Sequence, residues 1–224
     1  MTFSLIAQCP NTGQFGVAAT TAVPAVGKLL THATAGAGAV ATQARLNPYL
    51  GLDGVRLLSQ GISAMDALEQ LKLSDPCIEQ RQFSLLDCQG RTAAWTGSQC
   101  LDWAGHRESA GYCVQGNRLE GPEVLDAIEE SFLKSEGQPL CRRMIGALVA
   151  GGRAGGDRDG ALSATLYIVE CEEYPLWDIR VDEHSSPIEE LQRLYGVFEK
   201  DVIPHIREMP TRSNPGGTRG EACV

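Results

Sequence analysis

The sequence lacks most of the motifs that mark metal, nucleotide and serine-hydrolase sites. Its four histidines form no HxH or HExxH pattern, which argues against a zinc site built on one motif. It contains no GK[ST] phosphate loop and no GxSxG turn to present a nucleophilic serine. Its eight cysteines are never closer than eleven residues apart, so there is no CxxC redox or metal knuckle.

Targeting and membrane signals are also missing. No apolar run approaches the ~20 residues that span a bilayer, and the start of the chain has neither the basic segment nor the apolar segment of a signal peptide. The formal net charge of −9 argues against nucleic acid or an anionic membrane as the main partner. We therefore expect a cytoplasmic protein with reduced thiols, a small-molecule ligand and a homodimeric assembly.

What the sequence does have is enough apolar material for a core. Its 224 residues are 43% hydrophobic, which suits one domain, predicted over residues 1–206. Residues 207–224 are polar and rich in glycine and proline, and we expect them to form a flexible tail.

Hydrophobic periodicity predicts blocks of strands separated by helices. A period of two predicts strands over 2–8, 15–22, 81–87, 91–97, 110–117, 161–171 and 176–182, with two further short strands within 29–44. Helical spacing and capping residues predict helices over 47–61, from 63 onward, and over 121–137, 139–150 and 187–203. We expect a loop rich in Gly, Cys and Trp before residue 110. Strands in hairpin blocks favour antiparallel sheets with helices packed outside.

The N-terminus carries a possible nucleophile. In MTFSLIAQ, Thr2, Ser4 and Ile6 would face one way along a strand and Phe3 and Leu5 the other. A residue as small as Thr2 favours enzymatic removal of Met1, which would leave a hydroxyl beside a free α-amine. An α-amine ordinarily has a pKa of about 7.7–8.0, so it can accept the hydroxyl proton near neutral pH. The alternative is that Thr2 merely begins an edge strand.

Polar residues gather in four other places: residues 96–117, 151–160, 43–47 and 178–184. Polar clusters in loops on a rigid sheet are often functional. Each has a structural alternative, such as a surface ion pair worth about 0–1 kcal/mol or a half-buried histidine with its hydrogen bonds satisfied. The candidates taken from the first three are His106, Asn117, Gly116, Asp157, Arg158, Gln43 and Asn47.

Taken in order and spacing, several segments resemble a bacterial family, the DUF1028 domain. These are MTFS, GAGAVATQA, NPYLG, TGSQCLDWAGH, GYCVQGN, AGGDRDG and DIRVDEHSSPIEEL, and they span roughly residues 2–198. That family is similar to the N-terminal-nucleophile (Ntn) hydrolases. The resemblance implies an α+β fold, a four-layer αββα sandwich with two antiparallel sheets between helical layers. Where the family pattern GGDRxGxQSA has glutamine, this chain has Leu162.

The resemblance implies that the free N-terminal residue attacks an amide bond, with no metal or organic cofactor. Thr2 would then be both nucleophile and base. Asn117, the Gly116 N–H and Gln43 are candidate oxyanion donors. His106 and Asn47 would contact substrate, and Asp157 and Arg158 would orient the amine or a charged substrate group. Two alternatives stay open: a non-catalytic binding protein, and a metal-assisted hydrolase using His106, His184 and carboxylates.

Overall fold

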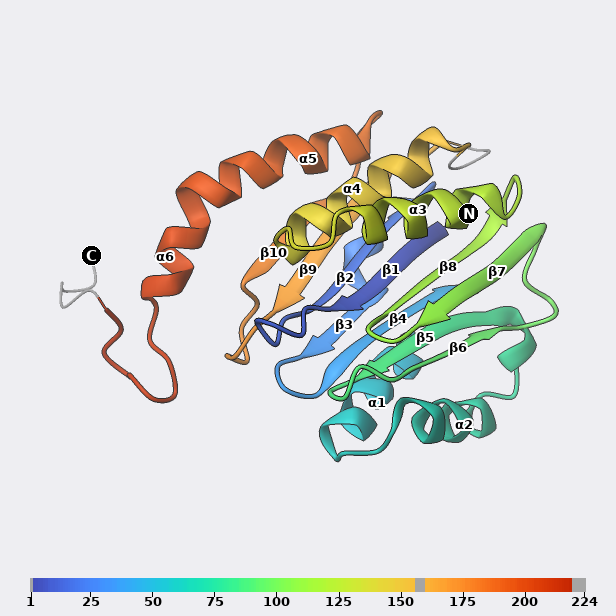
Figure 1. The fold of residues 1–224 in the computed structure, drawn as a ribbon. Coiled ribbons are helices and arrows are strands. Elements are labelled where there is room, and N and C mark those ends of the chain that lie inside the picture. Colours follow the sequence, from blue (N-terminus) through green and yellow to red (C-terminus); the bar gives the residue numbers. More distant parts are fainter. Residues whose placement is uncertain (1, 156–159, 219–224) are drawn as a thin grey trace.

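The computed structural model describes residues 2–155 and 160–218, and these form four layers (Figure 1). A six-stranded sheet has the order β10-β9-β2-β1-β8-β7, and a four-stranded sheet facing it has the order β3-β4-β5-β6, both antiparallel throughout. The first sheet comprises β1 (Thr2–Gln8), β2 (Phe15–Thr21), β7 (Trp103–Ser109), β8 (Tyr112–Leu119), β9 (Ser163–Val169) and β10 (Trp177–Val181). The second comprises β3 (Thr31–Thr34), β4 (Gly38–Ala44), β5 (Arg81–Asp87) and β6 (Thr92–Thr96).

Helices cover the outer face of each sheet (Figure 1). The helices on the six-stranded sheet are α3 (Glu123–Lys134), α4 (Leu140–Arg153) and α5 (Pro187–Val197), and those on the four-stranded sheet are α1 (Pro48–Ser59) and α2 (Ala64–Ser74). A π-helical turn, η3 (Phe198–Val202), joins α5 to α6 (Ile203–Glu208). Short 3-10 turns lie at η1 (Val26–Lys28) and η2 (Ile78–Gln80). The predicted αββα sandwich is confirmed.

The first strand lies in the middle of its sheet. β1 pairs with β2 on one side and β8 on the other, so the interpretation of residue 2 as the start of an edge strand is wrong. Phe3 and Leu5 pack into the core beneath the helices, whereas Ile6 packs between the sheets. The alternation predicted from the sequence is confirmed, and it directs Thr2 and Ser4 toward the second sheet.

The first two helices begin at the residues that the sequence marks. The Asn47 side chain accepts a hydrogen bond from the Tyr49 N–H, and Pro48 follows at the first helical position. Ser63 caps α2 by accepting from the Asp66 N–H at 3.2 Å. These helices hold the four-stranded sheet in place through a shared apolar core that includes Leu50, Leu68 and Phe83.

One predicted loop is a strand. β7 runs from Trp103 to Ser109 and pairs with β8, although the sequence led us to expect a loop there. It is an edge strand whose residues are only half-buried or exposed, so it can be built from Gly, His and Ser. A register shift between Trp103 and Gly105 also breaks the alternation that would have revealed it.

The AGAG segment allows the close backbone approach predicted for it. A Cβ on Gly38, whose φ is +149°, would lie 2.1 Å from the carbonyl oxygen of Leu86 on the neighbouring strand. The residue must therefore be glycine for β4 to pair with β5 at this register.

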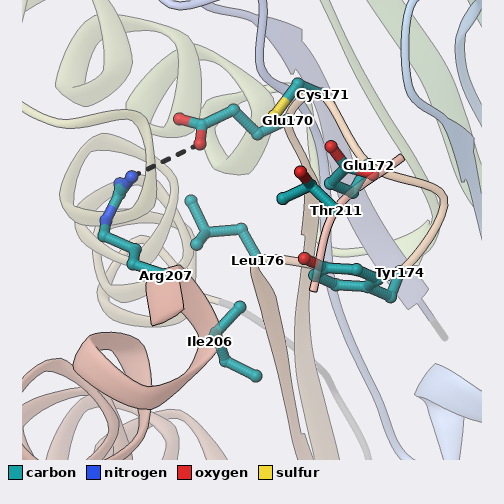
Figure 2. A pocket seen from close by; sticks show the side chains of 8 residues that line it. All are labelled: Glu170, Cys171, Glu172, Tyr174, Leu176, Ile206, Arg207 and Thr211. Carbon is teal, nitrogen blue, oxygen red and sulfur yellow. Dashed lines mark hydrogen bonds and ion pairs between the residues drawn. The ribbon is translucent and has the colours of Figure 1, made fainter. Parts of the chain in front are cut away.

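The described part of the C-terminal segment lies against the turn after β9. Tyr174 donates to the carbonyl of Pro210 at 3.1 Å, and Arg212 pairs with Glu173. A cavity of about 140 Å³ lies between the two segments, with Arg207 contacting Glu170 at 3.4 Å (Figure 2).

Among the helices of the described ranges, none has the length and apolarity needed to cross a membrane.

Candidate active site

A cavity of about 680 Å³ opens where β1 begins. The ends of β1, β2, β4 and β8 meet there, and residues 99–101, which precede β7, complete the lining. The strand residues that line it include Thr2, Thr21, Ala44, Asn117 and Arg118. Its size suits a small organic ligand.

The strand register places two polar side chains beside Thr2. Thr21 on β2 and Asn117 on β8 are its direct cross-strand partners, so all three side chains share the face that looks toward the second sheet. The Thr2 and Thr21 hydroxyl oxygens lie 2.9 Å apart. Thr2 is 9% exposed, and that remaining surface faces the cavity.

A fully buried glutamine of the opposite sheet fixes the orientation of Asn117. The Nε2 of Gln82 lies 2.8 Å from the carbonyl oxygen of Gly116 and 3.0 Å from that of Gly105, and both can only accept. Gln82 must therefore turn its Oε1 the other way, where it accepts from Asn117 Nδ2 at 3.0 Å. An amide nitrogen carries two hydrogens, so Asn117 keeps one for a ligand in the cavity that it lines.

The same oxygen of Gln82 extends the network behind Thr2. Gln43 Nε2 donates to it at 2.8 Å and also lies 3.4 Å from the carbonyl oxygen of Thr2. Gln43 Oε1 accepts from the Ser4 hydroxyl at 2.7 Å, and Gln115 Nε2 contacts that hydroxyl at 3.3 Å. These side chains are at most 1% exposed. The floor of the cavity is thus a hydrogen-bonded layer joining the two sheets.

His106 lies at the other end of this layer. Its Nδ1 is 2.9 Å from the Thr96 hydroxyl, which in turn lies 2.9 Å from Gln82 Nε2. Burial lowers the pKa of His106, and Arg107 lowers it further, while Glu108 opposes them. His106 is therefore neutral at pH 7 and contacts the cavity wall through two intermediaries rather than lining it.

The wall of the cavity also contains a thiol, that of Cys100. Burial raises the pKa of its thiol above the usual range, with a smaller contribution from Glu79, although the backbone at Gly97 works the other way. The thiol donates to the carbonyl of Arg81 at 3.4 Å. The buried, hydrogen-bonded thiol is therefore protonated and lacks the thiolate form that acts as a nucleophile.

The backbone around the cavity adopts unusual conformations. Of the described non-glycine residues, four have φ between 55° and 65°: Ala25, Ala44, Asp102 and Arg118. Two of them line the cavity, and Asp102 and Ala25 come one and two residues after lining residues. Left-handed backbone at such residues costs roughly 1–3 kcal/mol each and clusters at functional sites.

Two further candidates, Gly116 and Asn47, do not line the cavity. Gly116, whose N–H is a candidate oxyanion donor, is absent from the lining, and its carbonyl accepts from Gln82 Nε2 at 2.8 Å. Asn47 caps α1 and donates to Asp75 at 2.7 Å. Leu162 donates its N–H to the carbonyl of Thr21. Asp157 and Arg158 lie outside the described residues.

Comparison with known proteins identifies the family of the chain. The DUF1028 family, described as a family of unknown function, matches residues 2–191. The chain belongs to the DUF1028 family. A crystal structure of a DUF1028 protein, SPO2555 from Silicibacter pomeroyi, is 30% identical, covers 96% of this chain and 98% of its own, and superposes with a TM-score of 0.88.

The chain also resembles a more distant solved structure. Anbu (ancestral beta-subunit) from Yersinia bercovieri is 12% identical, with a TM-score of 0.45 over 91% of this DUF1028 chain and 97% of its own. No match was found among curated proteins.

Three residues of this candidate site were given no role from the sequence. Thr21 could have been found by counting back along the predicted β1–β2 hairpin from its turn. Gln82 belongs to a strand that was predicted, but nothing local to it indicates that it meets Asn117 of the other sheet. Arg45 follows directly on the strand that carries Gln43 and belongs to the polar segment 43–47, but the sequence alone assigned it no function. Across residues 2–155 and 160–218, no three His, Cys, Asp or Glu side chains are grouped so that they could hold a metal ion.

Proposed function

We propose that this protein is an Ntn-type hydrolase that cleaves an amide bond in a small cytoplasmic molecule, with Thr2 as nucleophile once Met1 is removed. One observation carries the proposal. The Thr2 hydroxyl lies in the wall of the large cavity, at the start of a central strand, with a second hydroxyl 2.9 Å away. A residue there with a free amine would hold nucleophile and base together.

The reaction has two steps. Thr2 Oγ1 attacks the amide carbon while its proton passes to the Thr2 α-amine, directly or through one water. The protonated amine then donates that proton to the leaving nitrogen as the C–N bond breaks, which leaves an ester on Thr2. Water attacks this ester, with the amine again accepting and returning a proton, and the acid product leaves with Thr2 restored.

Asn117 is the preferred oxyanion donor. Its remaining N–H is held in one orientation by Gln82, so little reorganisation is needed when charge develops on the substrate oxygen. Thr21 is a positioning residue. Its hydroxyl contact restricts the rotamer of Thr2, which keeps the nucleophile directed into the cavity.

The test begins with a screen of acyl-amide and cyclic-amide substrates on protein whose intact mass shows a chain starting at Thr2. Thr2→Ala should abolish turnover, because it removes the nucleophile, and should leave the fold intact, because one hydrogen bond contributes about 1 kcal/mol. Thr2→Ser should keep part of the activity. An added residue before Thr2 that resists trimming should be as harmful as Thr2→Ala, because it converts the basic amine into an amide.

A matched control is Thr92→Ala, which removes a hydroxyl that bonds to the Ser109 carbonyl on the surface, away from the cavity. Its turnover should equal that of the unmodified protein. Normal turnover by the Thr2→Ala protein, or by protein that retains Met1, would end the proposal.

A further inference from the structure

The cavity around Thr2 is lined by an arginine, Arg45, that has no acidic partner among the described residues. The chain carries a net charge of −9, yet the described residues that line this cavity include two arginines, Arg45 and Arg118, and no carboxylate. Charge of one sign in a concave site concentrates ligands of the opposite sign. The lining therefore indicates what kind of ligand the site accepts.

Arg45 is held in place by its neighbours. It follows Ala44, whose left-handed backbone turns the chain at the end of β4. The Arg45 N–H donates to the Gln80 carbonyl at 3.2 Å, and its Nη1 donates to Gln80 Oε1 at 2.6 Å. Gln80 in turn donates to Gln99 Oε1 at 3.1 Å, and all three side chains line the cavity. The guanidinium is thus one end of a hydrogen-bonded wall.

The charge of Arg45 is not matched by an acid in the described part of the chain, in contrast to that of its neighbour. Arg81 pairs with Asp75 at 2.8 Å, and both side chains are largely buried. The described side-chain partner of Arg45 is a neutral amide, which uses one of its five N–H donors. The other donors are free to bind an acceptor that enters from the cavity.

We propose that the substrate carries a carboxylate, which Arg45 binds while the amide bond of the same molecule lies at Thr2. This inference rests on the proposed function. A guanidinium presents paired N–H donors that match the two oxygens of a carboxylate, and Arg45 lines the same cavity as Thr2. The substrate class is therefore the small N-acylated amino acid or a related amide with one acidic end.

The experiment is isothermal titration calorimetry on the full-length Thr2→Ala protein, which lacks the nucleophile and so does not consume its ligand. Matched probes differ only in charge: N-acetylglycine against N-acetylglycinamide, and N-benzoylglycine against N-benzoylglycinamide. Each acid should bind roughly tenfold more tightly than its amide, as expected for a hydrogen-bonded ion pair in a partly exposed site.

Two further substitutions in the same background assign the effect to its residue. Arg45→Gln should remove most of the preference for the acids, and Arg45→Lys should keep part of it through its charge. Arg56→Gln, on the exposed surface of α1 where it pairs with Asp53, removes the same charge away from the cavity and should leave the preference unchanged.

Equal affinity for acids and amides, no detectable binding of any acid, or an unchanged preference in the Arg45→Gln protein would each overturn the inference. These outcomes are distinguishable from failure of the proposed function. Acids that bind through Arg45 to a protein whose parent hydrolyses nothing would support the anion site and refute the hydrolase.

Discussion

The space between the two sheets has two ends that are equally buried and chemically opposite. Along β1, β4, β5 and β8 the inward-facing residues change from polar to apolar in the same direction. At the cavity end they are Ser4, Gln43, Gln82, Gln115 and Asn117, and at the far end Ile6, Ala39, Leu86 and Cys113, none more than 4% exposed.

The apolar end is what a stable sandwich needs, because burial of apolar surface contributes about 25 cal/mol per Å². At the polar end, burial removes the side chains from water, and hydrogen bonds within the protein have to replace those made to water. Such a replacement changes the free energy of unfolding only slightly. A layer of buried amides beneath a cavity is therefore better explained by the geometry that it imposes on Thr2 and Asn117 than by its contribution to folding.

The largest expected effect is on the reaction rate. Asn117→Ala should lower kcat/KM by roughly 10²–10³, because it removes a donor from the developing oxyanion. Cys113→Ala changes the same face of the same strand at the apolar end and should leave kcat/KM within a few-fold. Both are measured with the substrate found in the screen. A similar loss in both variants would mean that the two ends do not differ in catalytic role.

The next effect is on stability. Gln82→Met keeps the volume but leaves the Gly116 carbonyl, the Asn117 amide and the Gln43 amide without their partner, so it should lower the free energy of unfolding by about 3 kcal/mol. Leu86→Met, on the same strand at the apolar end, should cost less than about 1.5 kcal/mol. Urea unfolding with tryptophan fluorescence gives both values. An equal loss of unfolding free energy in the two variants would show that the buried polar network contributes no more to stability than the apolar end does.

The smallest effect is on the pH dependence of stability. Burial lowers the pKa of His106 in the folded protein, so below about pH 6.5 the unfolded chain binds a proton that the folded chain resists. Stability should fall as the pH is lowered from 7 through that window, and His106→Gln should reduce the fall. His32, whose pKa is also lowered by burial, should account for part of what remains.

The measurement compares the His106→Gln protein with the unmodified protein. Unfolding is followed by urea titration at several pH values. If the His106→Gln protein retains the full slope, then the histidine does not titrate differently in the two states.

Local patterns predicted most of the fold and half of the site. The alternation of Thr2, Ser4 and Ile6 gave the inward face of β1, and Pro48 and Ser63 gave the helix starts. The polarity of residues 96–117 predicted a site that includes Asn117. Gln82 could not be selected in this way, because its role depends on how one sheet lies on the other, a contact between residues 35 positions apart in the chain. β7 was not predicted because its half-buried and exposed edge position does not require the alternating apolar residues by which a strand is recognised in a sequence.

Because β1 lies in the middle of its sheet, the proposed removal of Met1 has to occur before the neighbouring strands enclose the N-terminus. Thr2 is enclosed only when β8 has joined β1, and β8 begins at Tyr112. A ribosome adds ~5–20 residues per second, so the start of the chain stays accessible for roughly 5–20 s during synthesis. Removal of Met1 then competes with closure of the sheet, and chains that escape the aminopeptidase in this interval would fold with their nucleophile blocked. The fraction of active molecules would therefore depend on the speed of translation as well as on the sequence.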